Sequence, residues 1–237
     1  EDTKIKIYIY VNKVELGNHD KEVAGAGLVL YEIAQDANGT LLQDASGQYI
    51  LVQEDGADKV IDSWTSVDGG THDFGEHLKV GHEYVLRETV APVGYGRVTT
   101  DMQFAVQNNG TIVVRTTGQL TESTDANDNK VYLVEDTAIS FRVNKVDAGS
   151  GEEVEGAKLV VYEVVTDANG DAIKDANGQY TIVQENGEDK KVDSWTSVKN
   201  EVHDFGSKLE SGKTYILRET VAPDGYVRIT TDIEVKV

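Results

Sequence analysis

The sequence contains no cysteine, only two prolines and few aromatic residues. No disulfide can form, although a secreted domain with a small core often depends on disulfides. Hydrophobic residues make up 39% and aromatic residues 7% of the 237 residues, which predicts a thin hydrophobic core. The chain is therefore either intracellular or held together by something other than disulfides.

Positive charge is also scarce. Acidic residues outnumber basic ones 42 to 22, which gives a formal net charge of −20. Nucleic acids and anionic membrane surfaces both require clustered lysine and arginine, so neither is an expected partner. No apolar run approaches the ~20 residues of a membrane span, and the opening EDTKIKIYIY does not resemble a signal peptide. We expect a soluble fragment without membrane contact.

An internal repeat determines the predicted domain organisation. The segment AGAGLVLYEIAQDANG from Ala24 returns as EGAKLVVYEVVTDANG from Glu155, 131 residues later. The opening EDT likewise returns at residues 135–137. The sequence therefore predicts two tandem domains, a complete copy over residues 1–136 and a second copy over residues 137–237.

The second copy is shorter than the first. Val237 corresponds to Val106, so nothing in the second copy matches Gln107 to Val134 of the first. That stretch contains the turn and second strand of a predicted hairpin, FAVQNNGTIVV, and a predicted strand, KVYLV. Either the second copy is truncated, which is the simpler interpretation, or another chain supplies the missing strand.

Apolar residues alternate with polar ones along much of the chain, and helical periodicity is almost absent. The alternation runs from Ile5 to Val11 in the first copy and from Ile139 to Val143 in the second. Period-two patterning of this kind is typical of strands with one buried face. The sequence therefore predicts two all-β sandwich domains.

Short Asp- and Asn-rich motifs separate the predicted strands. DANG occurs at Asp36, Asp167 and Asp175, and DASG occurs at Asp44. An Asn-Gly pair between strands favours a type I′ hairpin turn, in which both central residues need a positive φ. We expect type I′ turns at these motifs.

Two charged residues continue an apolar face in each copy. The first predicted strand of each copy continues to Lys13 or Lys145, and Glu88 and Glu219 share a face with leucines in the motif LRETV. In one interpretation the lysine lies at the strand end and extends to solvent, while the glutamate pairs with it or caps a turn. In the other, each copy directs one amine and one carboxyl group into its interior.

Burial would change the chemistry of these groups. Desolvation lowers the pKa of lysine and raises that of glutamate, so that a buried pair can be neutral. A neutral lysine is a nucleophile. If a carboxyl or carboxamide group from a third strand lies against it, the two can form an amide while the glutamate transfers protons. Such a cross-link would replace the missing disulfides.

Two further motifs resemble a known family. YVLRETVAPVGY at residues 84–95 and YILRETVAPDGY at residues 215–226 fit the E-box pattern YxLxETxAPxGY of Gram-positive pilins and cell-wall-anchored adhesins. The lysine segments VNKVELG and VNKVDAG are similar to those of Cna B-type (SpaA-like, prealbumin-like) domains. The resemblance implies Ig-like or prealbumin-like sandwiches, a Lys–Asn or Lys–Asp isopeptide bond catalysed by the E-box glutamate, and an extracellular, wall-anchored location.

Residue by residue, the resemblance assigns Lys13 as the reactive amine and Glu88 as the catalytic acid. The partner lies near the end of the last strand, at Asp136 or alternatively at Glu135; strand parity cannot decide, because both faces of VYLV are apolar. Aspartate is the residue type found in the family, so we expect Asp136. The second copy keeps Lys145 and Glu219 but lacks a strand that carries a partner, so we expect no internal cross-link there.

The expected function is that of a structural stalk or shaft module in a surface adhesin or pilus, with neighbouring domains of the same assembly as partners. The alternative is a module that binds a host protein or glycan through loops at the sandwich tip. Binding loops should differ between the copies, whereas residues 36–64 and 167–195 are closely parallel. No cofactor and no turnover enzyme are expected.

Three other groups of side chains are interpreted as structural. The acidic turns could suggest calcium, but they lack an EF-hand pattern; their oxygen-bearing residues are Asp36, Asn38 and Asp44. The evenly spaced histidines could suggest zinc, but exposed loops explain them better; they are His72, His77 and His82. Trp64 and Trp195 are interpreted as core or edge aromatics, and not as a carbohydrate platform.

Overall fold

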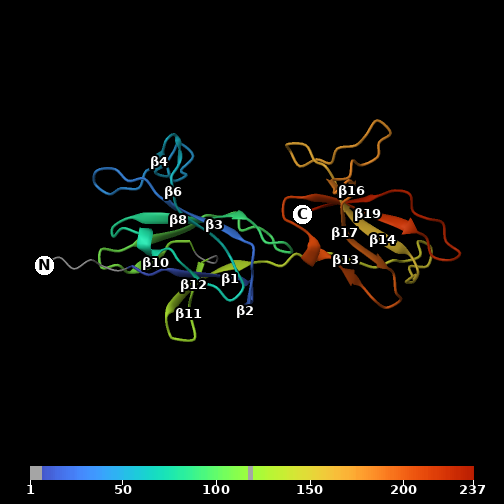
Figure 1. Ribbon diagram of the computed structural model, residues 1–237, viewed down its shortest axis with the longest axis horizontal. Coiled ribbons are helices and arrows are strands. Elements are labelled where there is room, and N and C mark those ends of the chain that lie inside the picture. Colours follow the sequence, from blue (N-terminus) through green and yellow to red (C-terminus); the bar gives the residue numbers. More distant parts are fainter. Residues whose placement is uncertain (1–6, 117–119) are drawn as a thin grey trace. The chain divides into compact units, whose positions relative to one another are not determined.

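The computed structural model describes residues 7–116 and 120–237 (Figure 1). The expectations about Ile5 and the opening EDT lie outside these residues. Within them the chain is built of β-strands, and its only helical elements are the 3-10 turns η1 (Gly75–His77) and η2 (Gly206–Lys208). The predicted all-β class is confirmed. None of the described helices has the length and apolar character needed to cross a membrane.

The chain forms two compact units. The first contains residues 1–92 and 97–137, and the second contains residues 93–96 and 138–237. The short segment 93–96 contains the last three residues of the first APVGY motif and belongs to the second unit. The domain boundary between residues 136 and 137 remains a prediction.

One sheet of the first unit joins the two ends of that unit. Its strand order is β11-β12-β1-β2, and β7 also pairs with β1. The pairing of β1 with β12 is parallel, whereas β11, β2 and β7 pair antiparallel with their neighbours. The strands are β1 (Tyr10–Glu15), β2 (Asn18–Glu22), β7 (His72–Asp73), β11 (Leu120–Thr124) and β12 (Lys130–Asp136).

A second, antiparallel sheet faces the first across the core. Its order is β10-β9-β8-β3-β6. The strands are β3 (Gly27–Glu32), β6 (Val60–Thr65), β8 (Glu83–Val90), β9 (Met102–Val106) and β10 (Ile112–Val114). Alternate residues of both sheets form one buried cluster, including Ile9, Val11, Leu28, Leu86 and Tyr132. This is the sandwich that period-two patterning predicts.

The second unit repeats only part of this arrangement. One sheet has the order β17-β14-β19-β20, and a short sheet contains β13 and β18. The strands are β13 (Arg142–Val143), β14 (Lys158–Glu163), β17 (Lys191–Thr196), β18 (His203–Asp204), β19 (Thr214–Val221) and β20 (Ile233–Lys236). Counterparts of β10, β11 and β12 are missing from residues 138–237, in agreement with the repeat alignment.

The DANG turns differ from the prediction. In the first, the Gly39 amide donates to the Asp36 carbonyl at 3.0 Å, and the Asp36 carboxylate accepts from the Asn38 and Thr40 amides. Only Gly39 has a positive φ, of 80°. This is a type I turn followed by a left-handed glycine, so the type I′ prediction is wrong. The aspartate side chain bonds to two backbone amides and thereby favours this alternative geometry.

Type I′ geometry occurs at another turn in each unit, between residues 33 and 58 of the first and between residues 164 and 189 of the second. Asp55 and Gly56 both have positive φ, 52° and 83°, between β4 (Gln53–Glu54) and β5 (Ala57–Asp58). Asn186 and Gly187 repeat this turn between β15 (Gln184–Glu185) and β16 (Glu188–Asp189). Both central residues therefore adopt the left-handed conformation that such a turn needs.

A close backbone approach requires glycine at the start of η1. A Cβ atom on Gly75 would lie far inside van der Waals contact with the Ile7 carbonyl oxygen. We expect Gly75→Ala to lower the free energy of unfolding by about 1–3 kcal/mol, because backbone must move to accommodate the methyl group. Urea denaturation measures the effect, with Glu76→Ala on the exposed side of the same turn as control. Equal midpoints for the two variants would contradict it.

Candidate functional site

Lys13 lies in the interior of the first unit. It belongs to β1, between β12 and β2, and only 1% of its surface is exposed. It follows Ile9 and Val11 on the core-facing side of the strand, as the alternation predicts. The interpretation in which this lysine extends to solvent is wrong, because β12 and β8 enclose its side chain.

The parallel pairing of β1 with β12 decides which acid faces Lys13. Lys13 lies opposite Val134, and Asp136, two residues further along, projects to the same side. Asp136 is 0% exposed, and its Oδ1 accepts a hydrogen bond from Lys13 Nζ. Glu135 projects to the other side, where its Oε1 contacts His19 Nε2.

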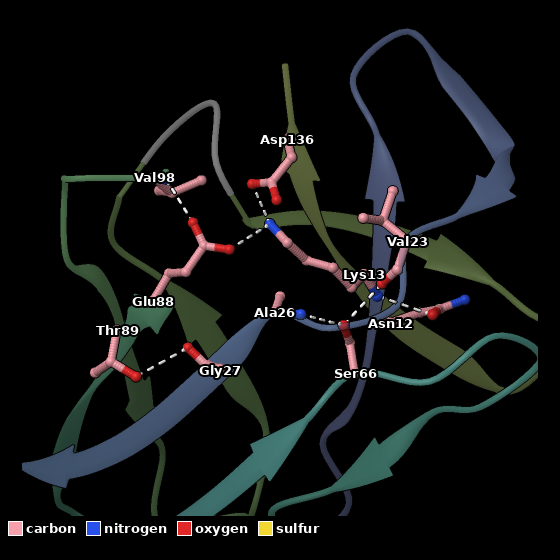
Figure 2. A network of polar contacts seen from close by, with 10 residues as sticks. All are labelled: Asn12, Lys13, Val23, Ala26, Gly27, Ser66, Glu88, Thr89, Val98 and Asp136. Carbon is pink, nitrogen blue, oxygen red and sulfur yellow. Dashed lines mark hydrogen bonds and ion pairs between the residues drawn. The ribbon is translucent and has the colours of Figure 1, made fainter. Parts of the chain in front are cut away.

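Glu88 reaches the same place from the opposite sheet. It lies on β8, and its Oε1 is 3.3 Å from Lys13 Nζ. Its Oε2 accepts a hydrogen bond from the Val98 amide at 2.5 Å, which fixes the carboxyl group. Figure 2 shows the Lys13 side chain ending between the carboxyl groups of Glu88 and Asp136. Three strands from two sheets therefore bring together one amine and two carboxyl groups.

Burial dominates the electrostatics of this cluster. It raises the pKa of Glu88 to about 7, against the opposing effect of the positive charge on Lys13. The nearby Asp136 carboxylate raises the Glu88 pKa further. Burial also raises the pKa of Asp136, again opposed by Lys13. With two acids beside one amine, the cluster retains a proton that the same groups would release in water.

The remaining carboxyl oxygens have few partners. Glu88 Oε1 and Asp136 Oδ2 are buried and accept no hydrogen bond within the described residues. Leaving such atoms unpaired costs free energy, so their presence calls for an explanation, and a chemical role is one. A carboxyl carbon beside a buried amine, with a second carboxyl group within reach, can undergo amide formation with loss of water.

Two supporting contacts were not predicted from the sequence. The Val98 amide that holds Glu88 is a backbone group, so its residue type carries no signal. Ser66 Oγ accepts from the Ala26 amide and donates to the Val23 carbonyl, at 2.9 and 2.7 Å, which ties the loop before β3 to the residue that follows β6 (Figure 2). The repetition of SWTS in both copies was the available signal for this serine, because Ser197 makes the same two bonds.

The second unit holds part of the same cluster. Lys145 Nζ is 3.6 Å from Glu219 Oε1, and Glu219 Oε2 accepts from the Ile229 amide at 2.6 Å. The Lys145 side chain is 15% exposed, and no acid corresponding to Asp136 lies beside it within residues 138–237. In this copy the structure therefore brings together the lysine amine and the E-box carboxyl group, without a third group equivalent to Asp136.

Two of the three histidines, His72 and His82, are less exposed than predicted. His72 lies on β7, not in a loop; its Nε2 is 2.9 Å from Asp62 Oδ2, and its ring stacks on Trp64. His82 Nδ1 lies 2.7 Å from Glu32 Oε1. These two side chains are half-buried because carboxylates lie beside them, whereas His77 is exposed. Within the described residues, no three histidine or acidic groups are arranged to hold a metal ion.

The tryptophans pack at the edge of each core. Trp64 is half-buried against the core of the first unit, and Trp195 against that of the second. Trp195 stacks on His203 with ring centroids 4.0 Å apart, which repeats the pairing of Trp64 with His72. One face of each indole is therefore covered by a histidine from the same unit.

Comparison with known families identifies the fold. The SpaA prealbumin-like fold domain matches residues 8–120 and 139–237. The chain belongs to this family. The family description names a fold and no enzymatic reaction. No curated protein matches the chain.

Several solved structures are similar at low identity. A C-terminal fragment of the pilus adhesin SpaC from Lactobacillus rhamnosus GG is 17% identical, with a TM-score of 0.39, over 98% of this chain and 81% of that one. The shaft pilin SpaA from the same organism is 16% identical, with a TM-score of 0.39, over 99% and 94%. The Bacillus anthracis TIE protein is 18% identical, with a TM-score of 0.34, over 98% and 32%. The chain spans 26% of a longer SpaC structure.

The charge on Lys13 limits the upward shift of the Glu88 pKa. In an Asp136→Ala chain, which cannot cross-link, we expect the added change Lys13→Met to raise the pKa of Glu88, because the group that favours its ionised form is removed while burial remains. Titration of side-chain carboxyl carbons by NMR measures the change. Lys59→Met, at the exposed pair with Glu54, is the control and should leave the Glu88 titration unchanged. A Glu88 pKa that falls in Lys13→Met would contradict the expectation.

Proposed function

We propose that the first unit cross-links itself through an isopeptide bond between Lys13 and Asp136, with Glu88 as catalyst. We further propose that the chain is a stalk or shaft module of a Gram-positive surface adhesin or pilus. The observation that supports the chemistry is the buried Lys13 amine, in contact with both carboxyl groups. Family membership and the LRETVAP motifs support the structural role.

The proposed reaction is a single condensation. A proton passes from Lys13 Nζ to the Glu88 carboxylate, and the neutral amine attacks Cγ of protonated Asp136. The Nζ–Cγ bond forms, one Cγ–O bond breaks, and the leaving oxygen takes up protons to depart as water. The second amine proton passes to the leaving hydroxyl group as the amide forms, so Glu88 ends protonated and keeps the proton that the ammonium group gave up first. The reaction needs no oxidant, metal or cofactor.

The pKa of Glu88 suits this double role. With a pKa of about 7, Glu88 can both accept and donate a proton near neutral pH. The Val98 amide holds Oε2, which leaves Oε1 directed at Nζ. Asp136 Oδ2, which accepts no hydrogen bond, is free to leave with its proton.

Strand topology connects the bond to mechanical load. β1 follows the N-terminal end of the first unit, β12 precedes its C-terminal end, and the two are parallel neighbours. Tension applied at the two ends pulls these strands in opposite directions along their shared edge. A covalent link from Lys13 to Asp136 would carry that tension directly from one strand to the other. The 122 residues between them would lie outside the path of force.

The exposed arms favour a spacer over a binding module. Residues 33–58 form an arm with bridges at Ile33–Leu51, Gln35–Leu41 and Gln43–Tyr49. Residues 164–189 repeat the same three bridges. Recognition loops normally differ between neighbouring domains, whereas these arms share both sequence and backbone pairing. Family membership supports the further proposal that the chain lies at the extracellular, wall-anchored surface, with neighbouring domains of its own assembly as partners.

The cross-link predicts a specific mass. We expect the intact chain to weigh one water less than its calculated mass, with a single linked pair, Lys13 to Asp136, in the tandem mass spectrum. Lys13→Ala and Glu88→Gln should show the full calculated mass, because nucleophile or catalyst is absent. Asp136→Asn should still cross-link, with loss of ammonia, and give the same final mass as the natural chain.

Two matched controls sharpen the mass measurement. Glu135→Gln leaves the proposed partner in place and should still lose one water. Glu219→Gln alters the corresponding acid of the second unit and should also lose one water, because that unit lacks an internal partner. If the natural chain has its full calculated mass, no cross-link has formed and that part of the proposed function is wrong.

The cross-link should also stabilise the first unit. A bond closing a loop of 123 residues reduces the entropy of the unfolded chain and contributes about 5 kcal/mol in the chain-entropy model. We expect Glu88→Gln, which prevents the bond, to lower the unfolding free energy of the first unit by about this amount. Glu219→Gln in the second unit should have a much smaller effect. Calorimetry of both variants measures these changes. Equal decreases in unfolding free energy for Glu88→Gln and Glu219→Gln would contradict the expectation.

A further inference from the structure

Arg87 and Asp101 form a bidentate ion pair beside the proposed reaction site. Arg87 lies on β8 and Asp101 immediately before β9, and Nε and Nη2 of the guanidinium group each donate to a carboxylate oxygen at 2.7 Å. The guanidinium carbon also lies 5.2 Å from the centre of the Tyr31 ring on β3. A two-point pair of this kind fixes direction as well as distance, because both groups are planar. The pair therefore fixes the point at which the chain enters β9.

Glu88, the next residue of β8, is held by the same loop. Successive residues of a strand point to opposite faces, so the half-buried Arg87 is directed away from the core and the buried Glu88 into it. The Val98 amide, three residues before Asp101, donates to Glu88 Oε2 at 2.5 Å (Figure 2). The loop is thus attached to both faces of β8, through Arg87 on one and Glu88 on the other.

The Arg87–Asp101 pair lies at the nearest anchor of the Val98 amide. Among the described residues, no backbone–backbone hydrogen bond joins residues 97–100 to another part of the chain. In one direction the loop leads to residues 93–96, which belong to the second unit. In the other it leads to Asp101, whose carbonyl oxygen also accepts a bond from Thr116 Oγ1 at 3.2 Å. The position of the Val98 amide within the first unit therefore depends on the attachment at Asp101.

The second unit repeats this arrangement. Nε and Nη2 of Arg218 donate to the Asp232 carboxylate at 2.8 and 2.7 Å, and the guanidinium carbon lies 5.4 Å from the centre of the Tyr162 ring. The Ile229 amide, three residues before Asp232, donates to Glu219 Oε2 at 2.6 Å. The ion pair and the amide bond to the E-box glutamate thus occur together in both units, which indicates that they act together.

We propose that Arg87 and Asp101 are positioning residues for the cross-linking reaction. Their ion pair holds the Val98 amide against Glu88 Oε2, so that Oε1 stays directed at the Lys13 amine. Among the contacts of the described residues, neither side chain of the pair reaches Lys13 or Asp136, so both act through the loop backbone and Glu88. The inference rests on the proposed function, because it names what positions the proposed catalyst.

The Val98 bond also affects the acidity of Glu88. Burial raises the pKa of Glu88 and the charge on Lys13 opposes this, while the bond from the Val98 amide also lowers the pKa because it stabilises the ionised carboxylate. The reaction begins with proton transfer to ionised Glu88, so its rate falls as the pH falls through the pKa of this group. Loss of the Val98 bond would therefore move this fall in rate to a higher pH.

Intact-mass measurements on freshly synthesised chain test the proposal. Chain from a short pulse of cell-free translation is transferred to buffers of different pH, and the fraction that has lost one water is followed over time. We expect Asp101→Ala to raise the midpoint of the acidic limb by roughly one pH unit, which lowers the rate about tenfold at about pH 6. Asp101→Asn, which keeps one side-chain oxygen as an acceptor, should fall between. Asp232→Ala removes the corresponding pair of the second unit and should change neither rate nor midpoint.

A second measurement does not depend on the cross-link. In an Asp136→Ala chain, which cannot cross-link, NMR titration of the Glu88 side-chain carboxyl carbon gives its pKa directly. The added change Asp101→Ala should raise this pKa, because the Val98 amide no longer favours the ionised form. The added change Asp232→Ala should leave it unchanged.

The outcomes separate this inference from the proposed function. If the natural chain loses water but Asp101→Ala keeps the natural midpoint, the positioning role is wrong and the proposed function stands. The same conclusion follows if Asp101→Ala is slower only in proportion to a smaller folded fraction, measured by circular dichroism. If the natural chain keeps its full mass, the proposed function is wrong. The positioning of Glu88 then rests on the titration alone, and an unchanged Glu88 pKa would overturn it.

Discussion

The first unit depends on one amine buried between two carboxyl groups. Removing such ions from water costs several kcal/mol for each, and one amine cannot neutralise two carboxylates. The protein lowers this cost by retaining a proton, as the raised pKa of Glu88 indicates. Condensation would lower it further, because the amine and one acid become a neutral amide and only a single acid remains. The arrangement that is unfavourable as an ion cluster is therefore well suited to the cross-linked product.

Much of this could be predicted from the sequence, because strand periodicity assigns each residue to a face. Counting in twos from Ile9 places Lys13 in the core, and the same count along β8 places Glu88 there. The repeat doubled each observation, since a charged residue on an apolar face in both copies is unlikely to be accidental. It also revealed that residues 138–237 contain no counterparts of the last strands of the first copy, and the strand order of the second unit agrees.

The partner acid could not be chosen by the same reasoning. β12 is covered on both faces: Tyr132 and Val134 join the main core, while Val131 and Leu133 pack with Val14 on the other side. Alternation carries no information when both faces are apolar, so only the parallel register with β1 separates Asp136 from Glu135. The turns were missed for a different reason, because aspartate side chains bonded to nearby amides change the turn type.

The parallel pairing of β1 and β12 has a consequence for how the protein matures. These strands lie at opposite ends of the first unit in sequence, so they meet only after the intervening chain has folded into place. An amide that requires this meeting cannot form in a nascent or misfolded copy, where amine and acid remain apart and solvated. The proposed bond would therefore be present only in copies that have folded correctly, and copies without it would remain open to proteolytic removal.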